Sequence, residues 1–94
     1  MSQQEIKVKV PDELLKGVYA NQMLVTHTKE EFVLDFINFF PPEGVVTARV
    51  IVSPGHAKRI AAALRENIEK YESRFGQIEE SSESGPPSAA LKIN

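Results

Sequence analysis

The sequence EFVLDFINFF, residues 31–40, has the composition of a β-strand that is apolar on both faces. Side chains alternate across a strand, so each face of this one carries large apolar groups. One face holds Phe32, Leu34, Phe36 and Phe40, and the other holds Val33, Ile37 and Phe39. A chain of 94 residues with one substantial helix can shield one face of a sheet. We therefore expect the second face to be buried against another copy of the protein.

Three further stretches have strand character. Residues 6–10 alternate Ile and Val with Lys and stop at Pro11, which is typical of an exposed edge strand. A turn or one short helical turn closed by Gly17 follows. Residues 18–28 lead through a short polar connection into residues 31–40, which predicts an antiparallel hairpin.

The last strand is predicted after the Pro41-Pro42-Glu43-Gly44 turn. It alternates regularly, so we expect a more apolar inner face and a more polar outer face. The inner set is Val46, Ala48, Val50 and Val52, and the outer set is Val45, Thr47, Arg49 and Ile51.

A long helix is predicted to begin at Ser53-Pro54. Serine can cap the free amides, and proline at the first helical position loses no hydrogen bond that it needed. Gly76 is placed to end the helix. An apolar stripe recurs at spacings of three and four residues and is expected to pack on the sheet. Its members are Ile60, Leu64, Ile68, Tyr71 and Phe75.

The fold class that follows is α+β. We expect a four-stranded, mainly antiparallel sheet followed by one long C-terminal helix, assembled as a homodimer or a dimer of dimers. Residues 1–78 form a single domain, and residues 79–94 are a flexible acidic tail rich in Ser and Pro. For the slightly apolar residues 89–94 we favour a frayed end over a docking peptide.

Composition limits the function classes. With 41% hydrophobic and 26% charged residues the chain is typical of a soluble protein, and its apolar runs are far shorter than the ~20 residues of a membrane helix. The start lacks a signal peptide, so we expect a cytoplasmic protein without membrane partners. The absence of cysteine excludes disulfides and thiolate chemistry. A net charge of −2 gives no global field for nucleic acid.

A set of short motifs resembles the bacterial family DUF3467, a domain of unknown function. The motifs are Tyr19-Ala20-Asn21, Glu31 to Asp35-Phe36, Pro54-Gly55-His56-Ala57-Lys58-Arg59, Asn67-Ile68, Tyr71-Glu72 and Phe75-Gly76. The resemblance covers about residues 5–78 and implies no activity. The expected strand order is also similar in outline to SecB-like proteins, although the second long helix of those proteins is missing here. Any export-chaperone role would be an analogy from fold to function.

One charged residue stands on the predicted subunit interface. Asp35 shares its face with Val33, Ile37 and Phe39, and an unpaired carboxylate there would cost several kcal/mol. Arg49 on the neighbouring strand is the expected partner, in a structural ion pair rather than a catalytic one. We therefore predict a subunit interface formed by Val33, Asp35, Ile37, Phe39 and Arg49.

The start of the helix is the second candidate site. Free amides and positive charge there could bind a phosphate or carboxylate. An ordinary helix cap is the favoured interpretation, because a glycine-rich nucleotide loop is missing. The candidate anion site consists of Ser53, Gly55, His56, Lys58 and Arg59.

The sequence shows no nucleophile with a companion base and no metal-ligand spacing, so we expect neither an enzyme nor a cofactor nor a metal site. The leading hypothesis is a non-enzymatic oligomeric module for protein binding or scaffolding, whose partners are itself and other proteins. A SecB-like holdase for unfolded chains is the first alternative. A weak nucleic-acid binder using Lys58, Arg59 and Arg65 is the second, against the acidic net charge.

Overall fold

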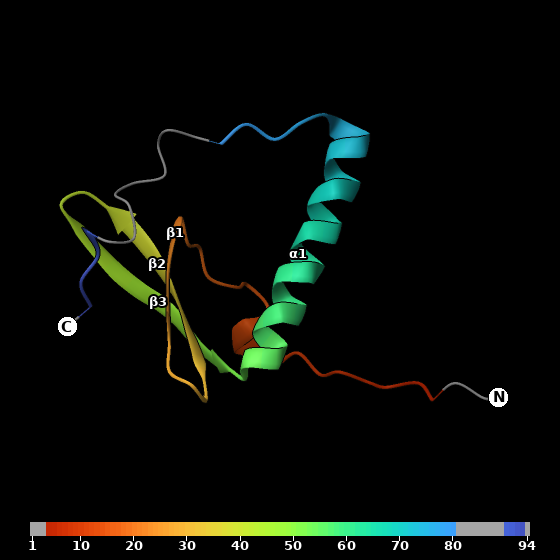
Figure 1. Ribbon diagram of the computed structural model, residues 1–94, viewed down its shortest axis with the longest axis horizontal. Coiled ribbons are helices and arrows are strands. Elements are labelled where there is room, and N and C mark those ends of the chain that lie inside the picture. Colours follow the sequence, from red (N-terminus) through yellow and green to blue (C-terminus); the bar gives the residue numbers. More distant parts are fainter. Residues whose placement is uncertain (1–3, 81–89, 94) are drawn as a thin grey trace.

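The fold is a three-stranded antiparallel sheet followed by one helix (Figure 1). The structure is a computed structural model and describes residues 4–80 and 90–93. The expected α+β class and the single C-terminal helix are confirmed. The elements are a short 3₁₀ turn η1 (Asp12–Leu14), the strands β1 (Gln22–His27), β2 (Phe32–Phe40) and β3 (Glu43–Val52), and the helix α1 (Pro54–Phe75).

The apolar strand β2 lies in the middle of the sheet, between β1 and β3. Among the described residues, the buried ones are Leu34, Asp35 and Ile37, all from β2. Leu34 and Ile37 project from opposite faces, because their positions differ by an odd number. The strand predicted to need cover on both sides therefore supplies the buried centre of the chain.

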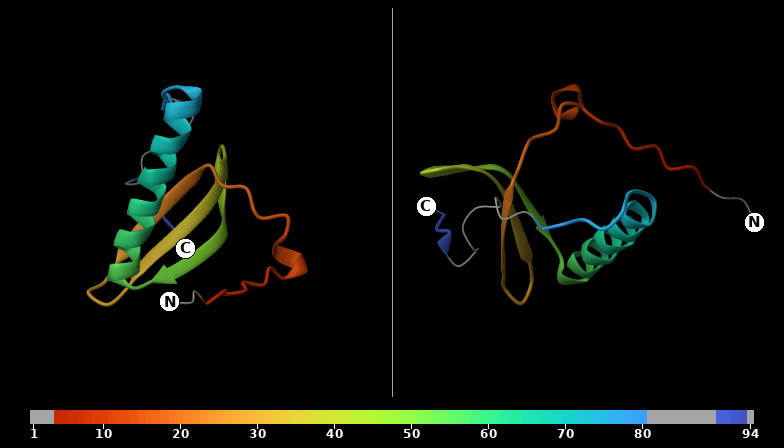
Figure 2. Two further views of the ribbon diagram at one scale, coloured as in Figure 1. Left: turned by 90° about the vertical axis from the view of Figure 1, so that its right-hand side faces the viewer. Right: turned by 90° about the horizontal axis from the view of Figure 1, so that it is seen from above.

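The predicted four-stranded sheet is wrong, because residues 6–10 form no strand. Ile6 and Val8 are more than four-fifths exposed. The chain turns through η1 and Gly17, whose positive φ of 67° suits glycine, and the segment before this turn runs away from the sheet (Figure 2). Alternation makes a segment capable of pairing, but a ladder also needs a free strand edge within reach. The strand predicted over residues 18–28 is also shorter, beginning at Gln22.

A β-bulge in β3 changes which side chains share a face. Phe36 pairs with Ala48, but the next residue, Ile37, pairs with Val46, so Thr47 is passed over. The Thr47 hydroxyl donates to the Phe36 carbonyl at 3.1 Å. Paired residues point to the same side of a sheet, so Val46 joins the face of Arg49. The regular alternation expected for residues 45–52 therefore fails at this point.

The two faces of the sheet are named here by a central residue of β2. The Asp35 face carries Val33, Asp35, Ile37 and Phe39, together with Val46 and Arg49 of β3. The Leu34 face carries Phe32, Leu34 and Phe36, together with Met23 and Val25 of β1 and Val50 of β3.

The helix has the predicted ends but not the predicted packing. The Ser53 hydroxyl accepts from the His56 amide at 3.1 Å, and Gly76, with φ of 96°, ends α1. The expectation that its apolar stripe packs on the sheet is wrong: Leu64 and Phe75 are 57% and 65% exposed. Ser53 alone separates β3 from α1, and the helix stands beside the sheet rather than across it (Figures 1 and 2).

Candidate binding surfaces

The ion pair predicted on β2 and β3 is present. Arg49 Nε donates to Asp35 Oδ1 at 2.6 Å, and the Arg49 terminal amino group donates to Asp35 Oδ2 at 3.2 Å. Asp35 is 2% exposed, whereas the arginine side chain reaches solvent. The hydrogen bond with Asp35, and then its charge, raise the pKa of Arg49 further above its ordinary value. The guanidinium is therefore charged whenever the carboxylate is, and the pair is a structural element of the sheet.

All five residues of the predicted subunit interface lie on the Asp35 face. Within this single chain Asp35 and Ile37 are already buried, at 2% and 4% exposure, and Val33 and Phe39 are half-buried. The sequence thus placed these side chains together correctly. Burial of Ile37, however, does not require a second copy, because the chain covers it by itself.

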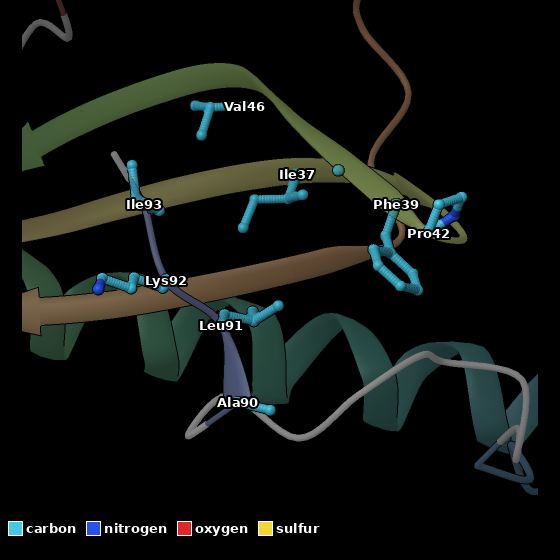
Figure 3. Close-up of a pocket in the computed structure, with 9 residues that line it drawn as sticks. Ile37, Phe39, Pro42, Val46, Ala90, Leu91, Lys92 and Ile93 are labelled. Carbon is cyan, nitrogen blue, oxygen red and sulfur yellow. The ribbon is translucent and has the colours of Figure 1, made fainter.

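Part of that cover comes from the C-terminal segment Ala90 to Ile93. These residues and the sheet enclose a hollow of about 530 Å³ on the Asp35 face (Figure 3). The sheet side of the hollow is lined by Ile37, Phe39, Pro42, Gly44 and Val46. Residues 90–93 line this hollow, and the choice between a frayed end and a docking peptide for residues 89–94 stays a prediction. The flexible tail predicted for residues 79–94 otherwise falls, at 81–89 and 94, outside the described residues.

Gly44 shapes the floor of this hollow. A Cβ at this position would lie 3.2 Å from Cγ2 of Ile37 and 3.3 Å from a ring carbon of Phe39. Both distances are tighter than ordinary van der Waals contact. The absence of a side chain at Gly44 therefore lets β2 and β3 place these two apolar groups close together beside the hollow.

The second candidate surface faces the other way. Residues 90–93 and α1 lie on opposite sides of the sheet, so the helix stands on the side of the Leu34 face (Figures 2 and 3). Both apolar surfaces there are open: four helix residues and three sheet residues are 40% to 65% exposed. They are Leu64, Ile68, Tyr71 and Phe75 on the helix, and Met23, Val25 and Val50 on the sheet. We call these seven residues the open apolar surface.

Asn21 completes the end of the sheet just before β1. Its side-chain amide donates to the Phe39 carbonyl at 2.9 Å and accepts from the Phe39 amide at 2.8 Å, while its own backbone amide donates to the Ile37 carbonyl at 3.0 Å. The side chain therefore takes the place of a strand residue opposite β2. Asn21 thus satisfies the end of the sheet, whereas Tyr19 of the same motif is 70% exposed.

The candidate anion site is a capped helix start. Besides the Ser53–His56 bond, a terminal nitrogen of Arg59 lies 3.2 Å from Nδ1 of His56. Gly55 and Lys58 are exposed in the same helical turn. The cap favoured from the sequence is confirmed, and the Ser53 hydroxyl is engaged in it. Anion binding by Ser53, Gly55, His56, Lys58 and Arg59 stays a prediction.

Other chemistry is sparse over the described ranges. His27 stacks on Phe32 with ring centroids 5.2 Å apart, as a structural side chain would. Residues 4–80 and 90–93 contain no cluster of three or more histidine or acidic side chains that could hold a metal ion. In the same part of the chain, no helix has both the length and the apolar character needed to cross a bilayer.

Comparison with known proteins identifies the family. The model of the family DUF3467, described as a protein of unknown function, matches residues 1–80. The chain belongs to this family. The match spans the sheet, the helix and the Asn21 pairing of this DUF3467 protein, so these features lie within the family domain, whereas residues 90–93 lie beyond it.

No curated protein and no solved structure matches this DUF3467 protein. The outline similarity to SecB-like proteins was drawn from a predicted four-stranded sheet, and the structure has three strands. The structure therefore supports the similarity to SecB-like proteins less than the sequence did.

Proposed function

We propose that this DUF3467 protein is a non-enzymatic oligomeric module for protein binding or scaffolding, and that it self-associates through the open apolar surface. The observation that supports this proposal is the half-exposed stripe of α1 opposite an equally open Leu34 face. Exposed contiguous apolar surface on a folded chain is characteristic of interaction sites.

The stripe is large enough to favour association. Full burial of a large apolar side chain contributes about 1.5–3 kcal/mol, so covering the exposed half of Leu64, Ile68, Tyr71 and Phe75 contributes about 4 kcal/mol per copy. Two copies contribute about twice this amount, and the three sheet residues add to it. Association costs about 4–15 kcal/mol in lost freedom. Burial of these side chains therefore offsets an association cost toward the lower end of that range, which makes a dimer energetically feasible.

A symmetric arrangement would satisfy both surfaces together. In a two-fold dimer the same patch is used by both copies, so the helix stripe of one can cover the Leu34 face of the other. Each copy would then gain the helix-on-sheet layer that its own helix does not supply. The arrangement leaves the Asp35 face available for other partners.

Sedimentation velocity on the full chain tests self-association. We expect twice the chain mass at micromolar concentration for the natural sequence. The variant Ile68→Asp places a charge in the middle of the stripe, and we expect it to be monomeric or unfolded, because a buried unpaired carboxylate opposes the interface. A monomeric natural sequence, or a dimer unaffected by Ile68→Asp, would contradict the proposal.

Ala62→Asp is the matched control. It introduces the same charge into the same helix, at an exposed position turned away from the stripe. Its helix-propensity cost, about 0.7 kcal/mol, is larger than that of Ile68→Asp, because alanine is the better helix former of the two replaced residues. We expect the Ala62→Asp chain to remain dimeric. Far-UV circular dichroism on both variants separates a loss of association from a loss of folding.

A holdase is the second candidate, because the open apolar surface could equally receive segments of unfolded chains. The two candidates predict different effects on the aggregation of a client protein. A holdase delays aggregation of a model client at stoichiometric amounts, and Ile68→Asp reduces that protection. If the dimer forms and the client aggregates at its unassisted rate, the scaffolding role stands alone.

A further inference from the structure

A short peptide of the chain itself forms the outer wall of the hollow on the Asp35 face. Leu91 and Ile93 are half-buried there, whereas Lys92 between them is exposed. This alternation is that of an extended segment, which directs every second side chain toward the surface beneath it. Figure 3 shows the segment in front of the sheet, below Ile37 and Val46 in the view.

The chemistry of the hollow suits such a peptide. Its sheet side is formed by apolar side chains of β2 and β3 and by Gly44, against whose backbone Ile37 and Phe39 pack closely. With the segment in place, about 530 Å³ between it and the sheet stays free, which is within the range of small-ligand sites, so the apolar floor can receive more than this segment covers. The contact is small, and the segment is joined to the family domain by a connection from Ile78 to Ala90. A small contact on a tether is readily exchanged for another of the same kind.

We propose that the Asp35 face is a peptide-binding site, and that Leu91-Lys92-Ile93 is its built-in ligand, which a partner peptide displaces. The partner is a short extended segment with two apolar side chains separated by one basic residue. The apolar pair packs against the sheet side of the hollow, and the basic side chain is exposed as Lys92 is. This proposal deepens the proposed protein-binding role, on which it rests for the existence of an external partner.

Competition between an added peptide and the chain's own C-terminal segment tests the proposal. A fluorescently labelled peptide of residues 88–94 is titrated into the full natural chain and into the full chain carrying Leu91→Asp and Ile93→Asp. A short tether supplies an effective concentration on the order of millimolar. For a peptide dissociation constant near ~0.1 mM, we expect binding to the double variant to be about tenfold tighter, because its own segment no longer competes. Lys92→Gln is the control and should bind the peptide as weakly as the natural chain does.

Adjacent valines provide a matched pair on the receptor side. Val46 lines the hollow, whereas Val45 points to the other face. We call the chain with Leu91→Asp and Ile93→Asp the tail variant. Val46→Asp, added to the tail variant, should abolish peptide binding. Val45→Asp, added in the same way, should change the peptide dissociation constant by no more than about twofold. Circular dichroism verifies that both chains are folded, so a loss specific to Val46→Asp reports on the site.

Three results of the peptide titrations would overturn the inference. They are equal affinity of the natural chain and the tail variant, an absence of binding up to millimolar concentration, and equal loss of binding with Val45→Asp and Val46→Asp. Sedimentation of the same samples keeps the two proposals apart. A dimer that binds no peptide contradicts only the peptide site, and a monomer that binds peptide contradicts only self-association. Loss of the dimer in the tail variant would place the segment on the partner copy and overturn the self-occupied form of the site.

Discussion

Asn21 lies one residue before β1 and pairs through its side chain with both backbone groups of Phe39. An asparagine side chain has the same donor and acceptor as a peptide group, so it can extend a ladder where the backbone turns away. The Tyr19-Ala20-Asn21 motif of the family thus has a structural explanation at its last position.

Replacing Asn21 by Ala should lower the free energy of unfolding by about 1–2 kcal/mol, because two exposed hydrogen bonds to Phe39 are lost. Urea denaturation measures the change. Asn38→Ala is the control, since Asn38 is exposed on the neighbouring strand, and its effect should lie within about 0.5 kcal/mol of zero. Equal effects of the two substitutions would mean that the Asn21 pairing contributes nothing to stability.

The contribution of the Asp35–Arg49 ion pair to stability can be tested with a double-mutant cycle. Arg49→Met should lower the denaturation temperature markedly, because it leaves the buried Asp35 carboxylate without its partner. Adding Asp35→Leu should recover most of that loss, since an apolar pair carries no desolvation penalty. Thermal melts of the natural chain, both single variants and the double variant form the cycle. A double variant less stable than Arg49→Met would contradict the account of this pair.

At the residue scale the sequence predicted contacts where the pairing follows from alternation, and it failed where alternation breaks. Asp35 and Arg49 share a face because each strand alternates regularly up to that point. Val46 was placed on the wrong face because the bulge at Thr47 inserts one residue. The Thr47 hydroxyl stabilises this bulge, but threonine is also common in regular strands. The sequence therefore carried no distinctive signal for the bulge.

At the element scale, the helix was predicted accurately because its signals are local. Ser53, Pro54 and Gly76 determine where it starts and stops, and each acts within one helical turn. A strand depends on a partner edge elsewhere in the chain. Residues 6–10 have the pattern of a strand without such an edge, and for this reason the fourth strand was predicted and is absent from the described residues.

Two glycines of the helix should respond in opposite directions to alanine. Gly55 lies in the first turn of α1, where a Cβ meets only Arg59 at 3.9 Å, so Gly55→Ala should stabilise the chain by about 0.5–1 kcal/mol. Gly76 has φ of 96°, which alanine adopts only with strain, so Gly76→Ala should destabilise it by about 1 kcal/mol. Urea denaturation of both variants checks the signs. Stabilisation by Gly76→Ala would contradict the cap geometry.

At the scale of the whole molecule, the chain has two apolar surfaces that differ in how they are covered. Residues 90–93 cover the part of the Asp35 face around Ile37, Phe39 and Val46, whereas the open apolar surface of α1 and the Leu34 face has no such cover among the described residues. The sequence predicted an excess of apolar surface and attributed it to the Asp35 face. It could not show the C-terminal cover, because four weakly apolar residues after an acidic stretch have no period that reports a contact. Nor could it show that the helix stands away from the sheet, since the stripe itself is the same in both arrangements.

Self-association through this open surface predicts that the α1 helices of two copies lie at a fixed separation in solution. The chain has no cysteine, so Ser73→Cys gives one labelling site per copy, at an exposed helix position turned away from the stripe. Double electron–electron resonance between spin labels at this site, on the full chain at micromolar concentration, measures the separation directly. The account predicts a single narrow distance between copies that is lost in Ile68→Asp. A signal without any dipolar modulation for the natural sequence would contradict it.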